Sequence, residues 1–416
     1  MAEKRLNICL LSYRGNPNSG GQGVYIHYLS RALMQLGHKV TVISSPPYPE
    51  IHSGVELIKI PNLDLYNPSH LFKPDDYAKL RDPINFWEYF LMTTGGFPEP
   101  LTFGLRVSRV FREQRPRFDI VHDNQCLAYG ILDIARMGYP TVATIHHPIT
   151  VDYQTELSAA TTLLKRLKVM RWYSFLRMQK RVVPKLSKII TVSECSRRDI
   201  SRDFKVPVAM FRVVPNGINT DFFFPQGDEL REDNRLLVTT SSDTPLKGLS
   251  VLLRALHLLN SSGRQVKLTV IGEPKKDGLV LKMVEELQLG TSVWFTGRID
   301  GQEFANHYAR TAIAVVPSLY EGFGMPAGEA MACGVPVISS DGGALPEVVG
   351  DAGIMVPAGS AADLAKAIAR LLDSPAERKA FAQKGLLRVA ASLTWEKAAQ
   401  KTVDVYREVI GANHRF

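Results

Sequence analysis

The opening of the chain places the strongest constraint on its fold. Residues 6–13 form an apolar run, a loop with four glycines follows, and residues 24–37 carry apolar side chains at helical spacing before a second apolar run at 39–45. Strand, glycine-rich loop, helix and strand form the βαβ unit that begins a doubly wound parallel sheet. Later apolar runs predict the other strands of this sheet, at 56–60, 119–122, 141–145 and 188–192.

The same alternation begins again in the second half, which predicts a second parallel sheet. Its strands are expected at 235–242, 266–272, 292–297, 312–318, 335–340 and 353–358. A length of 416 residues also favours two domains over one core. An Asn-Gly pair and nearby prolines place the hinge near residues 205–225. We therefore expect Rossmann-like domains at 1–205 and 206–393, and a closing helix at 394–416 that packs back on the first domain.

Composition and charge exclude several classes of protein. The net charge of +9 favours anionic partners, but no zinc-finger spacing, basic zipper or RNP-like strand accompanies it, so we expect no nucleic-acid binding. No apolar stretch reaches the ~18–20 residues that cross a bilayer, and the first residues lack the apolar region of a signal peptide. The four cysteines are isolated, as is typical of free thiols. We expect a cytoplasmic protein.

Two segments of the first half fit the sheet pattern poorly. Residues 61–110 are rich in aromatic residues and proline and suggest an irregular insertion, where substrate specificity often resides. Residues 163–188 hold nine Lys or Arg and no Asp or Glu. This basic segment is either a helix packed on the sheet or a face for anionic lipid, the aromatic residues at 85–104 favouring the second. The second interpretation predicts peripheral contact with the inner face of the cell membrane.

The first glycine-rich loop is a candidate anion site. It holds Gly15, Gly20, Gly21 and Gly23 between a strand and a helix, where backbone amides and the helix N-terminus favour negative charge. The spacing is not G-x-G-x-x-G, so it is weak evidence for a dinucleotide. A glycine turn with only a structural role remains the alternative.

A second glycine-rich segment is more informative. It leaves an apolar strand, turns through Gly322 and Gly324, and enters a helix with Pro326 near its first position. Glu321 precedes this helix and Glu329 lies within it, about two turns away. Ligands bind at the carboxyl ends of strands in open α/β sheets. Because carboxylates bind phosphate poorly and accept hydrogen bonds from hydroxyls well, this pair favours a sugar or ribose.

The segment E321 to E329 resembles the E-x7-E motif of glycosyltransferase family 4, which comprises retaining enzymes of the GT-B fold. The surrounding EGFGMPAGEAMACGVPVI is similar to the family as well, as are the downstream GGALPEVVGDAGIMV, the upstream VVPNGINTDFF and the early SGGQGVYIHYLSRALMQLGHKVTV. These matches extend from about Asn7 to Asp373. The resemblance implies two facing Rossmann-like domains with an interdomain cleft, the first on the acceptor side and the second binding a nucleotide sugar.

The resemblance also implies roles for individual residues. Glu321 would contact hydroxyls of the transferred sugar and Glu329 would hold the nucleotide ribose. The amides of Phe323 and Gly324 would contact sugar or phosphate. Lys247, in the sequence LKG, matches the lysine of the family's K-G motif and would stabilise charge on the diphosphate.

This chain departs from the family at one cation. Many relatives carry an arginine five or six residues before that lysine, whereas Ser241 and Ser242 stand at those places here. The phosphate clamp is then weaker, or another cation replaces the arginine. Arg14, beside the first glycine loop, and Arg298 are the two candidates. The alternative is that both are solvated surface arginines.

His146 and His147 end one strand of the first sheet. Two adjacent strand residues point to opposite faces and do not readily share a metal ion, so we expect no metal there. By the resemblance, His146 contacts the donor sugar, with His147 as the alternative. No D-x-D follows a strand, and we expect no divalent ion or other cofactor. The other donor contacts are expected around Glu273 and Arg298, with Gly20 and Gly21 on the first loop.

The resulting hypothesis is a retaining hexosyltransferase. It moves a hexosyl group from a nucleotide diphosphate sugar to a hydroxyl acceptor, such as a lipid-linked or cell-surface polysaccharide precursor, and a UDP-sugar is weakly favoured over GDP-mannose. Two alternatives remain: a non-hydrolysing sugar-nucleotide epimerase of the same architecture, and a binding protein that has lost activity with the missing arginine.

Overall fold

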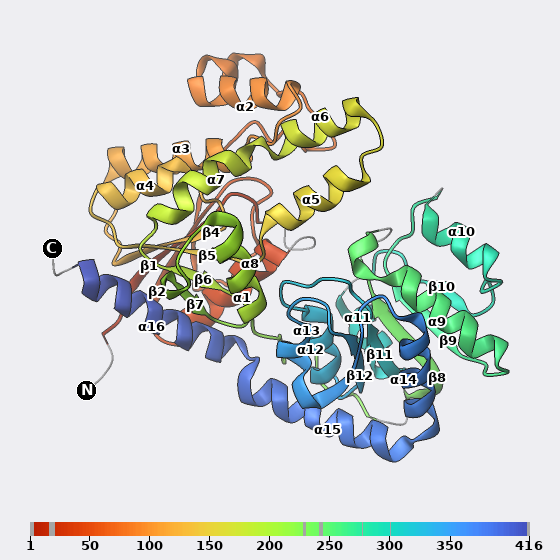
Figure 1. The fold of residues 1–416 in the computed structure, drawn as a ribbon. Coiled ribbons are helices and arrows are strands. Elements are labelled where there is room, and N and C mark those ends of the chain that lie inside the picture. The colour runs from red at the N-terminus through yellow and green to blue at the C-terminus, as the bar shows by residue number, and fades with distance from the viewer. Residues whose placement is uncertain are drawn as a thin grey trace. The chain divides into compact units, whose positions relative to one another are not determined.

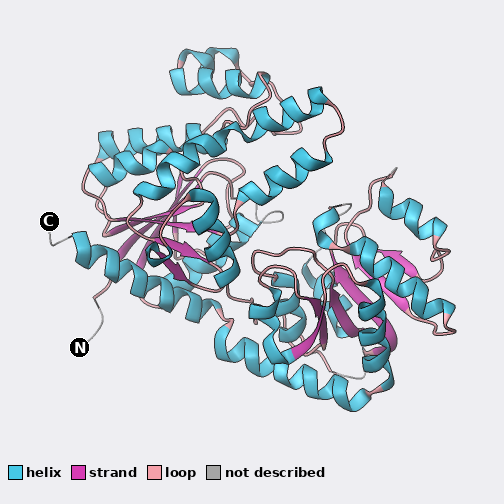
Figure 2. Cartoon of the chain, viewed as in Figure 1, coloured by secondary structure: helices cyan, strands magenta, loops and turns pink. Residues whose placement is uncertain are grey.

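The computed structural model describes residues 4–15, 21–227, 230–240, 244–276, 278–299 and 301–413. The chain divides into two compact units (Figure 2). Unit 1 contains residues 1–192, 196–214 and 395–416, and unit 2 contains residues 193–195 and 215–394. Among the described helices, none combines the length and hydrophobicity needed to span a bilayer.

Unit 1 is built on a parallel sheet of seven strands in the order β3-β2-β1-β4-β5-β6-β7. The strands are β1 (Asn7–Ser12), β2 (Lys39–Ser44), β3 (Glu56–Lys59), β4 (Ile120–Asn124), β5 (Thr141–Ile145), β6 (Ile189–Thr191) and β7 (Phe211–Val213). Six of these lie where apolar runs predicted them. The order reverses beside β1, so that β2 and β4 flank it on opposite sides.

Helices cover both faces of this sheet (Figure 1). The helices of unit 1 are α1 (Gly21–Gln35), α2 (Pro83–Thr93), α3 (Glu99–Gln114), α4 (Tyr129–Arg136), α5 (Ile149–Ala159), α6 (Leu163–Trp172), α7 (Leu176–Val182), α8 (Glu194–Phe204) and α16 (Trp395–Asn413). Of these, α2 packs on α3, and α6 has no buried residue. Alternate β1 side chains point to opposite faces, as the period of a strand requires. Ile8 and Leu10 pack with α1 and α16, while Cys9 and Leu11 pack with α3, α4 and α7.

The closing helix α16 belongs to unit 1 and contacts α1. Its Tyr406 hydroxyl lies 2.6 Å from Nδ1 of the buried His122 on β4, whose Nε2 lies 2.7 Å from the Thr144 hydroxyl on β5. Burial lowers the pKa of His122 to about 3, so this ring is neutral near pH 7. The last helix is therefore tied to the centre of the first sheet by a buried polar contact as well as by apolar packing.

The first sheet extends further along the chain than the sequence indicated. β7 pairs with β6 inside the segment assigned to the hinge, and the chain leaves unit 1 only after Val214. The boundary expected at residues 205–206 thus falls before the last strand. Strand β7 is only three residues long, too short for its alternation to stand out from the turn signals around it.

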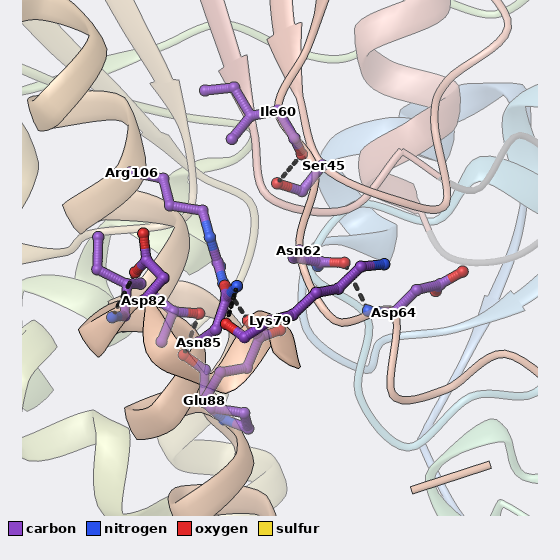
Figure 3. A network of polar contacts seen from close by, with 12 residues as sticks. Ser45, Ile60, Asn62, Asp64, Lys79, Asp82, Asn85, Glu88 and Arg106 are labelled. Carbon is purple, nitrogen blue, oxygen red and sulfur yellow. Dashed lines mark hydrogen bonds and ion pairs between the residues drawn. The ribbon is translucent and has the colours of Figure 1, made fainter. Parts of the chain in front are cut away.

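The insertion at 61–110 is more regular than expected, because it contains α2 and most of α3. A polar network holds α2 against α3 (Figure 3). The buried Arg106 on α3 pairs with the buried Glu88 and donates to Asn85 Oδ1 at 2.6 Å. Asp82 caps α2 and binds Arg109 at 2.6 Å. Glu88 thus faces α3, while Phe86, Trp87 and Phe90 of α2 are exposed.

Unit 2 contains a parallel sheet of six strands in the order β10-β9-β8-β11-β12-β13. The strands are β8 (Glu232–Thr239), β9 (Lys267–Ile271), β10 (Val293–Phe295), β11 (Thr311–Val316), β12 (Val337–Ser340) and β13 (Gly353–Val356). All six coincide with predicted runs to within a few residues. Two parallel α/β sheets with Rossmann-like order confirm the predicted fold class.

The unit 2 helices again cover both faces of the sheet. They are α9 (Leu249–Ser261), α10 (Leu279–Glu286), α11 (Gly301–Ala309), α12 (Met325–Ala332), α13 (Leu345–Val349), α14 (Ala361–Asp373) and α15 (Pro375–Ser392). One face forms a core with α9, α10 and α14, centred on leucines such as Leu252 and Leu256. On the other side, α12 contacts β11 and β12 and packs against α15.

Candidate active site

The second sheet reverses its strand order between β8 and β11. Such a switch point leaves a crevice at the carboxyl ends of the two strands, where ligands bind in open α/β sheets. The chain after β8 carries Lys247 and enters α9, and the chain after β11 carries Ser318 and Glu321 and enters α12. The topology therefore brings two of the predicted residues, 74 positions apart, to one place.

Lys247 and Glu321 are in direct contact. The lysine Nζ lies 2.7 Å from Glu321 Oε1, and the Ser318 hydroxyl donates to the same oxygen at 2.9 Å. The lysine side chain is 31% exposed and the glutamate 11%, so the ammonium faces outward from a carboxylate that anchors it. An ammonium carries three donors, and one of them is engaged by the residues that the structure describes. The others can meet a phosphate, while Glu321 Oε2 can accept from a sugar hydroxyl.

Close backbone approach fixes this pair. Gly248 has φ +67°, and a Cβ there would lie 1.9 Å from the carbonyl oxygen of Pro317. Leu319 N donates to Leu246 O at 2.7 Å, which joins the two loops directly. Gly343, in the loop after β12, lies equally close to the backbone of Glu321. The glycine of the K-G motif is thus required for packing between loops, as well as for its own turn.

Helix α12 begins at the same edge. Gly324 precedes it with φ +105°, and a Cβ there would lie 2.6 Å from Leu345 Cδ2. The side chain of the adjacent Phe323 is buried, so only its backbone could make the predicted ligand contact. The first amides of a helix have no partner within the helix and carry partial positive charge. The α12 terminus and that of α9 therefore supply favourable charge beside Lys247.

Glu329 lies within α12 and is only partly exposed to solvent. Its Oε2 accepts from the Tyr308 hydroxyl at 3.4 Å, the one hydrogen bond recorded for the carboxylate in the described structure. Burial raises the pKa of Glu329 to about 7. A buried carboxylate with so few partners is suited to accept from an incoming hydroxyl pair, the role that the family resemblance predicted for it.

The first sheet reverses its order between β1 and β4, which makes a second switch point. The glycine loop follows β1, Asn124 and Gln125 end β4, and His146 follows β5. The His146 backbone N–H donates to Gln125 Oε1 at 2.8 Å, and the ring Nε2 of His146 lies 2.7 Å from Asn124 Oδ1. Asn124 Nδ2 donates to Gln22 O in α1 at 3.2 Å.

These contacts define the protonation state of His146. Since Asn124 presents its oxygen, Nε2 of His146 carries the proton and Nδ1 keeps its lone pair. Burial, aided by the nearby His147 and His122, lowers the pKa of His146 to about 3. The Tyr25 ring packs edge-on against it at 4.6 Å. His146 is thus a neutral, fixed imidazole, whereas His147 lies 2.8 Å from Asp152 Oδ2.

Two family models and one relative identify the family of this chain. The model described as Glycosyltransferase Family 4 matches residues 19–222, and the model described as Glycosyl transferases group 1 matches residues 222–388. The MMP alpha-(1->4)-mannosyltransferase of Mycolicibacterium hassiacum is 43% identical over 410 residues, which cover 97% of this chain and 98% of that protein. The chain belongs to glycosyltransferase family 4.

Solved structures agree with this assignment. Sucrose-phosphate synthase from Thermosynechococcus elongatus superposes with a TM-score of 0.73 at 25% identity, over 98% of this chain and 100% of that one. Anabaena HepE, solved in complex with UDP and glucose, superposes with a TM-score of 0.69 at 16% identity, over 97% and 100%, and so shares the fold. This family-4 glycosyltransferase is therefore an enzyme that transfers a sugar to an acceptor.

The replacement cation of this family-4 glycosyltransferase is not evident at either expected place. Arg14 is engaged inside unit 1: its Nη2 binds Glu99 Oε1 at 2.9 Å and its guanidinium lies 4.5 Å from the Tyr66 ring. It is therefore no solvated surface arginine. Arg298 is 94% exposed and lies 3.8 Å from Glu273. Ser241 and Ser242 lie outside the described residues.

Gly20 and Gly21 are the two glycines predicted to contact the donor on the first loop. Gly20 lies outside the described residues, while Gly21 begins α1. A Cβ at Gly21 would meet no atom of the described residues within 4 Å. A 15-residue helix beginning there directs its amides to the edge that also carries Asn124 and His146. The role of Gly21 in phosphate binding stays a prediction.

Sequence reasoning missed several residues of these edges. Asn124, Gln125 and Ser318 position the predicted groups through the hydrogen bonds above, and Tyr308 does so for Glu329. The first three stand at the ends of buried strands, which was the available signal. Tyr308 gave none, because it lies in α11 and reaches Glu329 only through the fold.

We expect nucleotide binding to depend on the ionisation of Glu329. Its raised pKa leaves the side chain neutral below about pH 7 and charged above it. Since the carboxylate is the better acceptor for ribose hydroxyls, the affinity for a nucleoside diphosphate should fall up to about tenfold between pH 8 and pH 6. Calorimetric titration at several pH values measures this fall.

Glu329→Gln is the matched control for that titration. It should bind more weakly than wild type at pH 8 and lose the part of the pH dependence that Glu329 causes. The phosphate of the ligand titrates equally with both proteins, so only the difference between the two pH profiles is interpreted. Identical profiles would remove Glu329 from ribose binding.

Proposed function

We propose that this enzyme transfers a mannosyl group from a nucleotide diphosphate sugar to a saccharide hydroxyl with retention of anomeric configuration. The observation that carries the proposal is the Lys247–Glu321 pair at the switch point of the second sheet. It offers one cation for a diphosphate and one carboxylate for a sugar, side by side. The mannosyl group is supported by the name of the 43% identical relative.

The groups that stabilise the charge developing on the diphosphate lie in unit 2. When the bond between the anomeric carbon and the phosphate oxygen breaks, negative charge grows on the leaving diphosphate. Lys247 Nζ and the N-termini of α9 and α12 favour that charge. Glu321 holds the sugar hydroxyls, so that the anomeric carbon stays in place as it gains positive character. We propose as well that the reaction needs no divalent ion.

Retention follows if the acceptor attacks the face from which the diphosphate departs. The acceptor oxygen forms the new bond to the anomeric carbon, and its proton passes to the leaving phosphate oxygen, so no protein nucleophile takes part. In unit 1, the neutral His146 can contact the donor sugar without opposing the reaction. A charged imidazolium beside a carbon that gains positive charge would raise the barrier. Its Nδ1 lone pair is the atom available to a sugar hydroxyl.

The nucleotide and the acceptor are further parts of the proposal. A mannosyl donor makes GDP-mannose the first compound to test against UDP-glucose, although the sequence weakly favoured a UDP-sugar. The relative's name indicates an α-(1→4) linkage, and so a 4-hydroxyl on the acceptor. A short α-(1→4)-linked mannoside is therefore the first acceptor, tested beside a lipid-linked one.

Contact with an anionic membrane is also proposed, from the surface of α2 and α6. Helix α2 exposes Phe86, Trp87 and Phe90. Helix α6 has no buried residue and exposes four apolar residues between its basic ones: Leu163, Leu164, Leu167 and Met170. Apolar side chains flanked by Lys and Arg match an anionic interface. Flotation with phosphatidylglycerol vesicles, and failure to float after Trp87→Ser with Leu164→Ser, would support this contact.

The function is tested by donor binding and product analysis. A nucleotide at ~100 times its dissociation constant should stabilise the protein by roughly 2.7 kcal/mol, which a thermal scan detects. UDP, GDP and ADP are compared with and without EDTA, and the product with the stabilising donor is examined by proton NMR. An α-linked mannoside formed in EDTA supports the proposal. A β-linked product, or interconversion of donor without acceptor, contradicts it.

A further inference from the structure

Unit 1 contains a pocket that no step of sugar transfer uses. It has a volume of about 210 Å³ and lies between the segment joining α2 to α3 and the helices α6 and α7. Its walls come from Phe97, Leu101, Phe175 and Met178, together with Tyr129 at the start of α4. An apolar cavity of about 150 Å³ holds a benzene ring, so this pocket is large enough for a ring or a segment of alkyl chain.

The apolar wall is held in place by aromatic contacts. The Phe97 ring lies 5.2 Å from the Trp172 ring and 5.5 Å from that of Phe175. On its other side it meets Tyr13, at the end of β1, with the ring centres 6.3 Å apart. Rings packed at these distances do not collapse into the space beside them. The pocket is therefore a built feature of the fold, adjacent to the edge that carries the first glycine loop.

Three arginines line the same pocket. Arg171 donates to the Ser174 hydroxyl at 3.0 Å and to the Thr94 hydroxyl at 2.5 Å, and Arg181 donates to the Tyr129 hydroxyl at 3.3 Å. None of the three, Arg177 included, forms an ion pair with a carboxylate of the described residues. Like charges gathered without a counter-ion repel one another and favour an anion between them.

A glycine makes room for one of these guanidinium groups. A Cβ at Gly96 would lie 2.6 Å from Arg171 Nη1 and 3.1 Å from the carbonyl oxygen of Leu91. The guanidinium of Arg171 thus lies directly against the backbone at Gly96. Together with the two hydroxyl contacts, this fixes the position of Arg171 at the pocket, and a planar guanidinium held in one place favours bidentate binding of phosphate or carboxylate.

We propose that this pocket binds an amphiphilic anion, with its apolar part against Phe97, Leu101 and Met178 and its phosphate or carboxylate on Arg171, Arg177 and Arg181. The chemistry of the pocket requires both parts of such a ligand. An apolar molecule without charge leaves the arginines unneutralised, and a free phosphate leaves the apolar wall exposed. The inference stands on unit 1 alone, so it does not depend on the donor or the sugar proposed above.

Octyl phosphate below its micelle concentration is the probe, titrated by calorimetry against the full-length protein. One molecule should bind, at least about tenfold more tightly than octyl glucoside or inorganic phosphate, since each lacks one part of the ligand. Tighter or equal binding of either of those compounds overturns the proposal. Phosphatidic acid vesicles form a further arm, and binding to vesicles without binding to octyl phosphate assigns the charge to membrane contact and overturns the pocket.

Two variants separate pocket binding from general attraction. The double variant Arg177→Gln with Arg181→Gln removes two positive charges from the pocket at exposed positions. It should weaken octyl phosphate binding about tenfold or more. Arg112→Gln with Arg117→Gln removes the same charge at exposed positions that do not line the pocket, and this matched control should bind as wild type does. Leu101→Phe keeps every charge and fills the pocket. Unchanged affinity in both pocket variants, with normal thermal unfolding, overturns the assignment.

Discussion

Replacing Lys247 with alanine should lower the turnover number about 10²- to 10³-fold, the range found when one preorganised donor to a developing charge is removed. The ammonium is only 2.7 Å from Glu321, the carboxylate proposed to bind the sugar, and it is the cation that the described structure places at this switch point. The substitution also removes the ammonium from the Glu321 carboxylate, which keeps its hydrogen bond from the Ser318 hydroxyl. Steady-state kinetics with the identified donor measure the loss, and calorimetry with the nucleoside diphosphate measures the accompanying loss of affinity.

Lys366→Ala is the matched control for this substitution. Lys366 lies on α14 in the same unit, is 80% exposed, and within the described part of the chain pairs with Asp363 at 3.7 Å. Its removal changes the net charge equally and should leave the turnover number near that of wild type. The double substitution Lys247→Ala with Glu321→Gln should cost less than the sum of the single ones, because the two groups act as a pair. A Lys247→Ala enzyme with turnover within threefold of wild type would refute the assignment.

Replacing Gly248 with alanine should damage both stability and activity. The backbone there has φ +67°, which costs a non-glycine residue about 1–2 kcal/mol. The new Cβ would also lie 1.9 Å from Pro317 O, and a backbone carbonyl cannot move aside as a flexible side chain does. Separating the two loops displaces Lys247 from Glu321. We expect at least tenfold lower turnover at temperatures where the variant is still folded.

Gly263→Ala isolates the clash from the backbone strain. Gly263 follows α9 in the same unit, has φ +88°, and offers a Cβ open space within 4 Å. It should lose only the strain energy, a shift in Tm of a few degrees, and keep its turnover. Gly248→Ala should unfold several degrees lower still. Equal shifts in Tm for the two variants, with equal turnover, would mean that the contact with Pro317 does not hold the site.

The sequence predicted which residues form the candidate site, but it predicted only some of the contacts between them. The sequence identified Lys247, Glu321 and Glu329 through motifs that a glycine turn and a helix N-terminus make specific. It did not indicate that Lys247 and Glu321 touch, because the distance between residues 74 positions apart depends on the order of β8 and β11 in the sheet. It also offered Arg14 as a free cation, which Glu99 and Tyr66 engage.

The sequence by itself determined the two parallel sheets and the position of nearly every strand. Buried parallel strands read as continuous apolar runs, and glycine loops and helices alternate with them along the chain. It did not determine β7 or the helical character of the insertion. A three-residue strand has too few side chains for a period, and α2 depends on Arg106 and Asp82 at distant or flanking positions.

Only the tertiary structure decided which groups are charged and which are paired. His146 and Glu329 have ordinary sequence surroundings, yet burial lowers the pKa of the first to about 3 and raises that of the second to about 7. Burial arises from segments far apart in the chain, and desolvation acts over a few ångströms in space and not along the sequence. The same holds for the arginine-lined pocket, whose walls come from the α2–α3 segment, α4, α6 and α7 and meet only when the chain is folded.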